Sequence, residues 1–162
     1  MNEQQRLYLI QARSDRAVLQ LLDSHSLPAC HQLLYLQMLT EKLAKAYFWR
    51  NPGVKVLGHA AFVRFIRSIA TNRRIAEGIG FRDLVSFGEW IADISDLAYE
   101  LERLAPALAA DGPNTEYPWP RASPTKAPAE YPFAISMRLK SRNGFTLLKM
   151  LDVILENFED WF

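Results

Sequence analysis

Apolar side chains recur at steps of three and four residues along almost the whole chain, and this spacing is the period of an α-helix. Seven glycines in 162 residues leave few natural breaks in the pattern. No segment shows the strict alternation that is typical of a strand. The sequence therefore predicts an all-α fold, an antiparallel bundle of four or five helices that forms one domain over residues 1–162.

The periodic segments place the expected helices at residues 5–23, 29–49, 59–76, 82–109 and 143–161. Residues 51–58, "NPGVKVLG", are expected to end the second helix, because Pro52 cannot continue it. Pro106 is expected to kink the end of the fourth. The side chains expected to face the core are Leu7, Ile10, Ala17, Leu21 and Leu22 in the first helix and Leu147, Leu151, Ile154 and Phe158 in the last.

Residues 111–133 differ from the rest because they hold six of the nine prolines. Such a segment forms neither a helix nor a regular strand. It also carries four aromatic residues, which is more than a free linker needs: Tyr117, Trp119, Tyr131 and Phe133. We expect an extended proline-rich arm pinned to the helices by these rings, with Trp119 and Tyr131 at least partly buried.

Charge and cysteine content narrow the class of protein. The chain has 19 lysines and arginines against 18 aspartates and glutamates, so a generally basic nucleic-acid coat is not expected, although a local patch is compatible with these numbers. A single cysteine, Cys30, forms no internal disulfide and fits a reducing compartment. The first residues have no apolar signal core, and no apolar run approaches the ~20 residues that span a bilayer. The sequence predicts a cytoplasmic protein without a membrane segment.

A polar stripe runs along the second helix, where Gln37, Glu41 and Lys45 follow one another at steps of four. Glu41 and Lys45 are in the order that favours a helical ion pair. This spacing is typical of a solvated helix face, and we predict that the stripe faces water and carries no chemistry.

Two stretches resemble HEPN domains, the higher-eukaryote and prokaryote nucleotide-binding family. "QMLTEKLAKAYF", residues 37–48, is similar to the second helix of that family, with matches at Gln37, Glu41, Lys42, Lys45 and Ala46. "ARSDRAVLQLLDS", residues 12–24, is similar to its first helix. The helix number and chain length also fit. The resemblance covers about 35 residues in motif and implies a HEPN-like helical bundle.

Many HEPN proteins are metal-independent ribonucleases with an arginine, four to six residues and then a histidine. In such a motif the arginine holds phosphate and the histidine moves a proton. None of the three histidines of this chain has an arginine at the required distance before it. In "SRNGFTLLKML", Arg142 and Asn143 match the start of the motif, but Leu147 stands where the histidine is expected. Arg142 and Asn143 remain candidates for phosphate or RNA binding, with plain capping of the last helix by Asn143 as the alternative.

A second basic region adds Arg73 and Arg74 to the candidates for phosphate or RNA binding. They belong to a group of five arginines within nineteen residues: Arg64, Arg67, Arg73, Arg74 and Arg82. A solvated helix end is the alternative. Asp93, Asp96 and Glu100 share a helix face but have no histidine or cysteine cluster beside them, so we expect no metal, and no cofactor motif occurs.

The resemblance and the missing histidine together predict a non-catalytic HEPN-like binding module. The family implies a nucleotide or RNA ligand and a nucleotidyltransferase partner, as in prokaryotic toxin–antitoxin or defence pairs. The alternative is a divergent metal-independent ribonuclease or nucleotide-handling enzyme that uses Arg142 and Asn143 with His31 or His59. The last helix carries more large apolar residues than one inward stripe can use, so a homodimer through that helix is expected.

Overall fold

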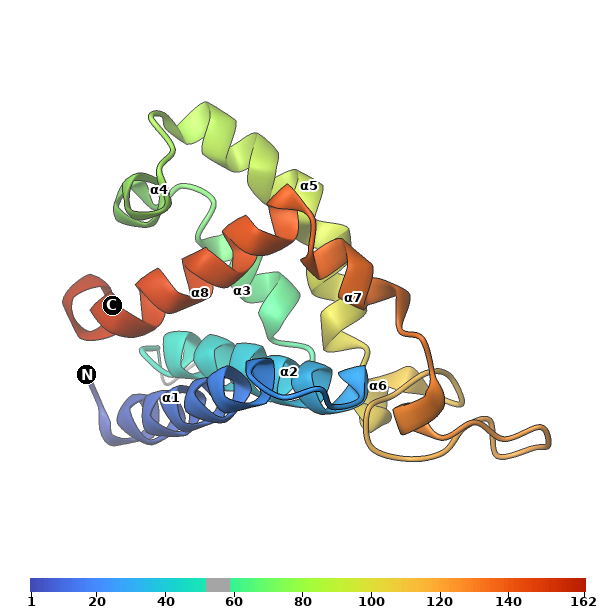
Figure 1. Ribbon diagram of the computed structural model, residues 1–162. Helices are drawn as coiled ribbons and strands as arrows, with labels where there is room; N and C mark the ends of the chain where they lie inside the picture. The colour runs from blue at the N-terminus through green and yellow to red at the C-terminus, as the bar shows by residue number, and fades with distance from the viewer. Residues whose placement is uncertain (52–58) are drawn as a thin grey trace.

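The computed structural model describes residues 1–51 and 59–162, and this part of the chain is helical with no β-strand (Figure 1). The all-α prediction is confirmed. Four long helices make the frame: α1 (Glu3–Asp23), α2 (Ala29–Phe48), α5 (Leu84–Glu102) and α8 (Arg142–Trp161). No helix in residues 1–51 and 59–162 is long and apolar enough to cross a membrane.

The helices α1 and α2 form an antiparallel pair along one side of the molecule (Figure 1). Asn2 caps α1 by accepting a hydrogen bond from the Gln5 N–H, and the Gln5 side chain accepts one in return from the Asn2 N–H. The Asn2 side-chain amide also donates to the Trp49 carbonyl oxygen, at 2.7 Å. This contact joins the start of α1 to the end of α2.

The predicted core stripe of α1 is wrong. Leu7, Ile10 and Leu21 are exposed, as is Ala17, while Leu22 is half-buried. The residues that α1 buries are Gln5, Leu9, Ala12, Asp15 and Leu19. They also follow steps of three and four, but two of them are polar. A prediction that followed only apolar residues therefore selected a different face of the helix.

The third expected helix, 59–76, is divided into α3 (Phe62–Ser68) and α4 (Arg73–Ile79). The division follows from Asn72, whose side-chain oxygen accepts the Ile75 N–H at 3.2 Å and starts a new helix. The helix α2 ends at Phe48, ahead of the predicted break at 51–58. Residues 52–58 of that break lie outside the described residues.

The fourth expected helix, 82–109, is also divided. Asp83 caps α5 through the Ser86 N–H, and α5 ends at Glu102. A short helix, α6 (Pro106–Ala109), follows after a break. Pro106 is its first residue, a position where the missing N–H costs nothing, so the proline starts a helix instead of kinking one.

The proline-rich arm packs against the helices as predicted. Trp119 and Phe133 are buried and Tyr131 is partly buried, whereas Tyr117 is exposed. The Trp119 and Tyr131 rings meet edge to face with centroids 5.0 Å apart. The arm contains a short 3-10 helix, η1 (Pro128–Glu130), that contacts α2. A short helix that the sequence did not predict, α7 (Ala134–Leu139), connects the arm to α8.

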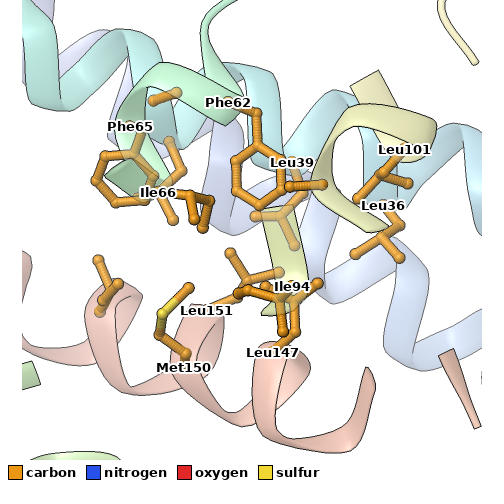
Figure 2. Packing of buried hydrophobic residues seen from close by; sticks show 14 of the residues in the cluster. Leu36, Leu39, Phe62, Phe65, Ile66, Ile94, Leu101, Leu147, Met150 and Leu151 are labelled. Atoms are coloured by element: carbon orange, nitrogen blue, oxygen red, sulfur yellow. The ribbon is translucent and has the colours of Figure 1, made fainter. Parts of the chain in front are cut away.

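The last helix supplies the centre of the core (Figure 2). Its four predicted inward residues, Leu147, Leu151, Ile154 and Phe158, are all buried. Ser141 caps α8 by accepting the Gly144 N–H at 3.2 Å, so the alternative that placed Asn143 at the cap is wrong and Asn143 lies inside the helix.

Most of the surplus apolar residues of α8 are covered within the chain. Met150 and Leu155 are buried, and α4 packs on the face that carries Val153 and Trp161. Phe145 is the exception, because 62% of it is exposed. The apolar surface of α8 that is left to contact a second subunit is therefore smaller than the sequence indicated.

Candidate functional site

A cavity of about 510 Å³ lies where the connection from α4 to α5 meets the first turn of α8. Two of the four candidate residues, Arg142 and Asn143, line it together with Arg82. Arg142 and Asn143 were predicted as a pair, and Arg82 was part of the second basic region. The fold therefore brings together two basic segments that are sixty residues apart in the sequence.

Local structure fixes the positions of both arginines. Gly80 ends α4 in the left-handed conformation, with φ of 101°, and this turn sends Phe81 and Arg82 toward the start of α5. Ser141 caps α8, so Arg142 and Asn143 occupy its first turn, where backbone N–H groups without helical partners favour an anion. Both guanidinium groups are exposed, and neither forms an ion pair within the described residues.

The other polar groups of this cavity have distinct roles. Asp83 caps α5, and hydrogen bonds from the backbone N–H and hydroxyl of Ser86 lower the pKa of its carboxyl. Its charge offsets one of the two arginines. Trp90 is buried in the wall of the cavity, and its indole N–H has no hydrogen-bond partner in residues 1–51 and 59–162. The cavity lining therefore offers two cations and one side-chain amide.

The two remaining candidates lie close to this cavity but outside its lining. Arg73 forms an exposed ion pair with Glu77 at 3.6 Å, and it shares a smaller depression with Arg82. Arg74 donates to the carbonyl oxygen of Asp160, at 2.8 Å, and so satisfies the end of α8. Of the two, Arg73 shares that depression with Arg82, but Glu77 offsets its charge.

No histidine contributes to the cavity. Leu147, which stands where the HEPN resemblance leads us to expect a histidine, is fully buried in the core. His31 is exposed at the start of α2, and His25 bonds to the carbonyl oxygen of Leu21 at 2.8 Å. His59 contacts Glu41 and is absent from the residues that line the cavity. The cavity lining in the described part of the chain therefore brings Arg82, Arg142 and Asn143 together without a histidine.

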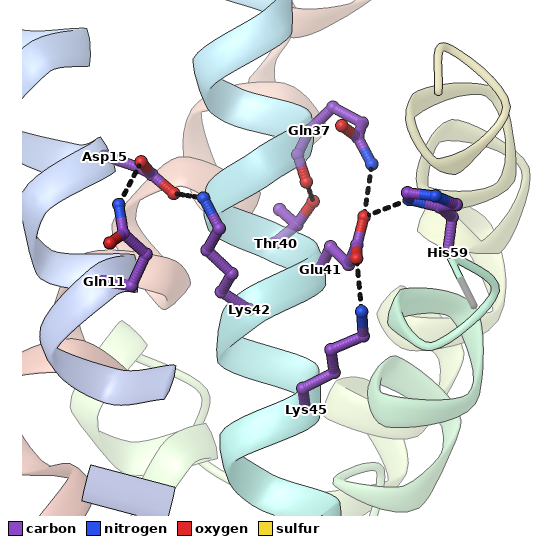
Figure 3. Close-up of polar contacts among 8 residues, drawn as sticks. All are labelled: Gln11, Asp15, Gln37, Thr40, Glu41, Lys42, Lys45 and His59. Carbon is purple, nitrogen blue, oxygen red and sulfur yellow. Dashed lines mark hydrogen bonds and ion pairs between the residues drawn. The ribbon is translucent and has the colours of Figure 1, made fainter. Parts of the chain in front are cut away.

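The polar stripe of α2 is not the solvated face that we predicted. Figure 3 shows Gln37, Lys45 and His59 turned toward Glu41. Gln37 is 3% exposed and the Glu41 side chain 12% exposed. Glu41 accepts hydrogen bonds from Lys45 at 2.5 Å, from His59 Nδ1 at 2.6 Å and from Gln37 at 3.1 Å. Burial alone raises the pKa of Glu41, but these hydrogen bonds and the charge of Lys45 together lower it. The prediction that these residues share one helix face is correct, but the prediction that this face is exposed to water is wrong.

Two further buried carboxylates lie near this network. Asp15 of α1 is almost fully buried and pairs with Lys42 at 2.5 Å, and Gln11 donates to it as well (Figure 3). Glu102, at the end of α5, accepts the Phe62 N–H at 2.8 Å and the Val63 N–H at 3.3 Å, so it caps α3. Burial raises the pKa of Glu102, the two N–H groups act against this, and the charge of Glu41 adds to the rise.

Sequence reasoning missed Arg82 as a partner of Arg142, and it missed the contact between Glu41 and His59. The only sequence signal for the contact between Glu41 and His59 was the position of His59 next to a predicted break in the helices. Comparisons add no further constraint: the chain matches no protein-family model, no curated protein and no solved structure.

Proposed function

We propose that this protein is a non-catalytic HEPN-like binding module that takes a phosphate-bearing ligand, a nucleotide or RNA, in the cavity between Arg82 and Arg142. The observation that carries the proposal is the convergence of these two guanidinium groups on one cavity of about 510 Å³. Arginine presents a planar fork of donors that matches phosphate oxygens. Asn143 and the first turn of α8 add donors, and the cavity volume lies within the range of small-molecule sites.

The absence of catalysis is proposed on separate grounds. Transfer of a proton from the RNA 2′-hydroxyl needs a group that titrates near neutral pH. Leu147 fills the family position with a buried apolar side chain, and the three histidines lie outside the cavity lining. Arginine and asparagine bind phosphate but do not exchange protons at this pH.

Binding of ATP, without added metal, tests the cavity. We expect ATP to bind in isothermal titration calorimetry and adenosine, which lacks phosphate, to bind far more weakly. Arg82→Ala and Arg142→Ala are each expected to weaken ATP binding about tenfold or more, because each removes a charge-assisted hydrogen bond. Arg67→Ala is the matched control, because Arg67 is exposed on α3 and does not line the cavity. Equal losses in all three variants would contradict the proposal.

The enzyme alternative has one observation in its favour, the contact between Glu41 and His59. A buried carboxylate that orients an imidazole is an arrangement that general bases use, and 42% of the His59 side chain is exposed. Incubation of metal-free protein with single-stranded RNA decides between the two functions. We expect no cleavage; cleavage that disappears in both Arg142→Ala and His59→Ala would establish the enzyme instead.

The resemblance to HEPN domains also suggests a protein partner. HEPN-like modules of this kind pair with a nucleotidyltransferase, and we propose such a partner and a cytoplasmic location for this chain. Purification from the native host with mass spectrometry of bound proteins tests the pairing. Recovery of the protein without any nucleotidyltransferase would contradict it.

We also propose a homodimer formed through the start of α8. Phe145 is 62% exposed, and burying such a side chain contributes about 1.5–3 kcal/mol per subunit. Light scattering at high micromolar concentration is expected to give twice the 18.6 kDa of one chain. Phe145→Glu is expected to give a monomer with an unchanged helical circular dichroism spectrum. A monomeric unmodified protein would refute the dimer.

A further inference from the structure

A second cavity, separate from the one between Arg82 and Arg142, lies between the α1–α2 connection and the α7–α8 corner. It measures about 570 Å³, within the range of sites that hold small organic molecules. Its walls are mainly aliphatic, with Leu33 and Leu36 from α2 facing Leu139 and Leu148 from the α7–α8 region. Phe145 stands exposed at its edge. An occupant must therefore be largely apolar.

The polar groups of this second cavity are unevenly paired. Arg16 forms a bidentate ion pair with Asp152, and Asp23 accepts from Gln32 at 3.3 Å while also facing Arg16. These groups on the α1 side satisfy one another. On the α7 side the Ser136 hydroxyl is buried without a hydrogen-bond partner in the described structure, and Lys140 forms no ion pair there.

Ser136 lies in α7 and Lys140 directly follows its last residue, and both line this cavity. A buried hydroxyl without a partner is costly, and an ammonium group in the lining of the same cavity favours an anion. One group satisfies both: a carboxylate, whose two oxygens accept from the hydroxyl and from the ammonium at the same time.

We propose that this second cavity binds an amphipathic organic acid, with its carboxylate held by Ser136 and Lys140 and its apolar chain between α2 and α8. The proposal is independent of the phosphate-binding function, because the two cavities share no lining residue. The proposal predicts that the cavity prefers an acid to an alcohol or an amine of the same chain length.

Octanoate, octanol and octyltrimethylammonium are matched probes that differ in the head group alone. In calorimetric titrations of the full chain we expect octanoate to bind at least tenfold more tightly than the other two. Ser136→Ala and Lys140→Ala are each expected to weaken octanoate binding about tenfold. Ser136→Ala has a second readout: without octanoate its thermal midpoint is expected to equal or exceed that of the unmodified protein, because the variant removes an unpartnered buried hydroxyl.

A blocking variant tests the location. Ala29 lines the cavity, so Ala29→Phe is expected to fill it and abolish octanoate binding while ATP binding is retained. Octanoate binding that survives in a folded Ala29→Phe protein would overturn the assignment, as would equal binding of all three probes or no binding at millimolar concentration.

Discussion

Gly144→Ala is expected to destabilise the protein by about 3 kcal/mol or more, through a collision between two backbones. Gly144 is buried at the start of α8, where the chain turns back against the end of α7. A Cβ atom at this position would lie within 2.5 Å of the Cα and carbonyl carbon of Leu139, and it would also strike the Leu139 carbonyl oxygen. Backbone atoms cannot move aside as a flexible side chain does, so α7 and α8 must separate.

Thermal unfolding measures this loss. For a domain of this size the change corresponds to a decrease of about 6–12 °C in the midpoint. Gly88→Ala is the matched control, because Gly88 lies inside α5 and a Cβ there meets nothing within 4 Å. That control is expected to stabilise by about 0.5–1 kcal/mol, since alanine favours the helix. Similar midpoints for the two variants would show that the α7–α8 contact is looser than described.

Gly144→Ala is also expected to affect the cavity that Arg82 and Arg142 line. Arg142 and Asn143 directly precede Gly144, so separation of α8 from α7 moves them relative to Arg82. Gly144→Ala is therefore expected to weaken ATP binding below its unfolding temperature, whereas Gly88→Ala is not. Unchanged ATP affinity in Gly144→Ala would contradict this part of the prediction.

Glu41→Gln is expected to cost about 2–3 kcal/mol at pH 7, because it leaves the Lys45 ammonium without an anion in a largely buried setting. The loss is expected to shrink in acid, and the sign follows from linkage. The folded-state pKa of Glu41 lies below its ordinary value of 4.5, so the unfolded chain binds more protons in that range. The contribution of Glu41 is therefore present above pH 4.5 and is lost as the pH falls through its folded-state pKa.

Urea unfolding of both proteins at pH 7 and pH 3 provides the measurement. The difference in unfolding free energy between unmodified protein and Glu41→Gln is expected to be larger at pH 7. An equal difference at both pH values would show that Glu41 does not stabilise the fold as an anion.

Glu102→Gln is the comparison, because the pKa of Glu102 is raised and the sign reverses. Ionised Glu102 destabilises the folded state, and this cost grows as the pH rises above 4.5. Glutamine carries no charge and retains an oxygen that accepts the N–H groups of Phe62 and Val63. Glu102→Gln is therefore expected to compare more favourably with the unmodified protein at pH 7 than at pH 3.

The sequence determined the helices wherever apolar periodicity and local signals agreed. Leu147, Leu151, Ile154 and Phe158 were predicted to be buried and are, because one face of a helix this apolar has no alternative to the core. The proline-rich arm was predicted for a similar reason: proline excludes a helix, and aromatic rings such as Trp119 must leave water. The break at Asn72 is also encoded locally, as a side-chain cap, whereas the apolar periodicity on both sides of it predicts one continuous helix.

The tertiary structure alone decided which polar residues are buried and which meet. Gln37, Glu41 and Lys45 have a spacing that suits an exposed face and a buried one equally, and periodicity does not distinguish them. His59, eighteen residues further along the chain, joins Lys45 and Gln37 in satisfying the buried Glu41 carboxylate. Arg82 and Arg142 line one cavity because the turn at Gly80 and the close approach at Gly144 direct two separate helix starts to the same place. Helical spacing is determined within a few residues of the chain. The contact between Glu41 and His59 and the shared cavity of Arg82 and Arg142 depend on how whole helices pack, which no local pattern specifies.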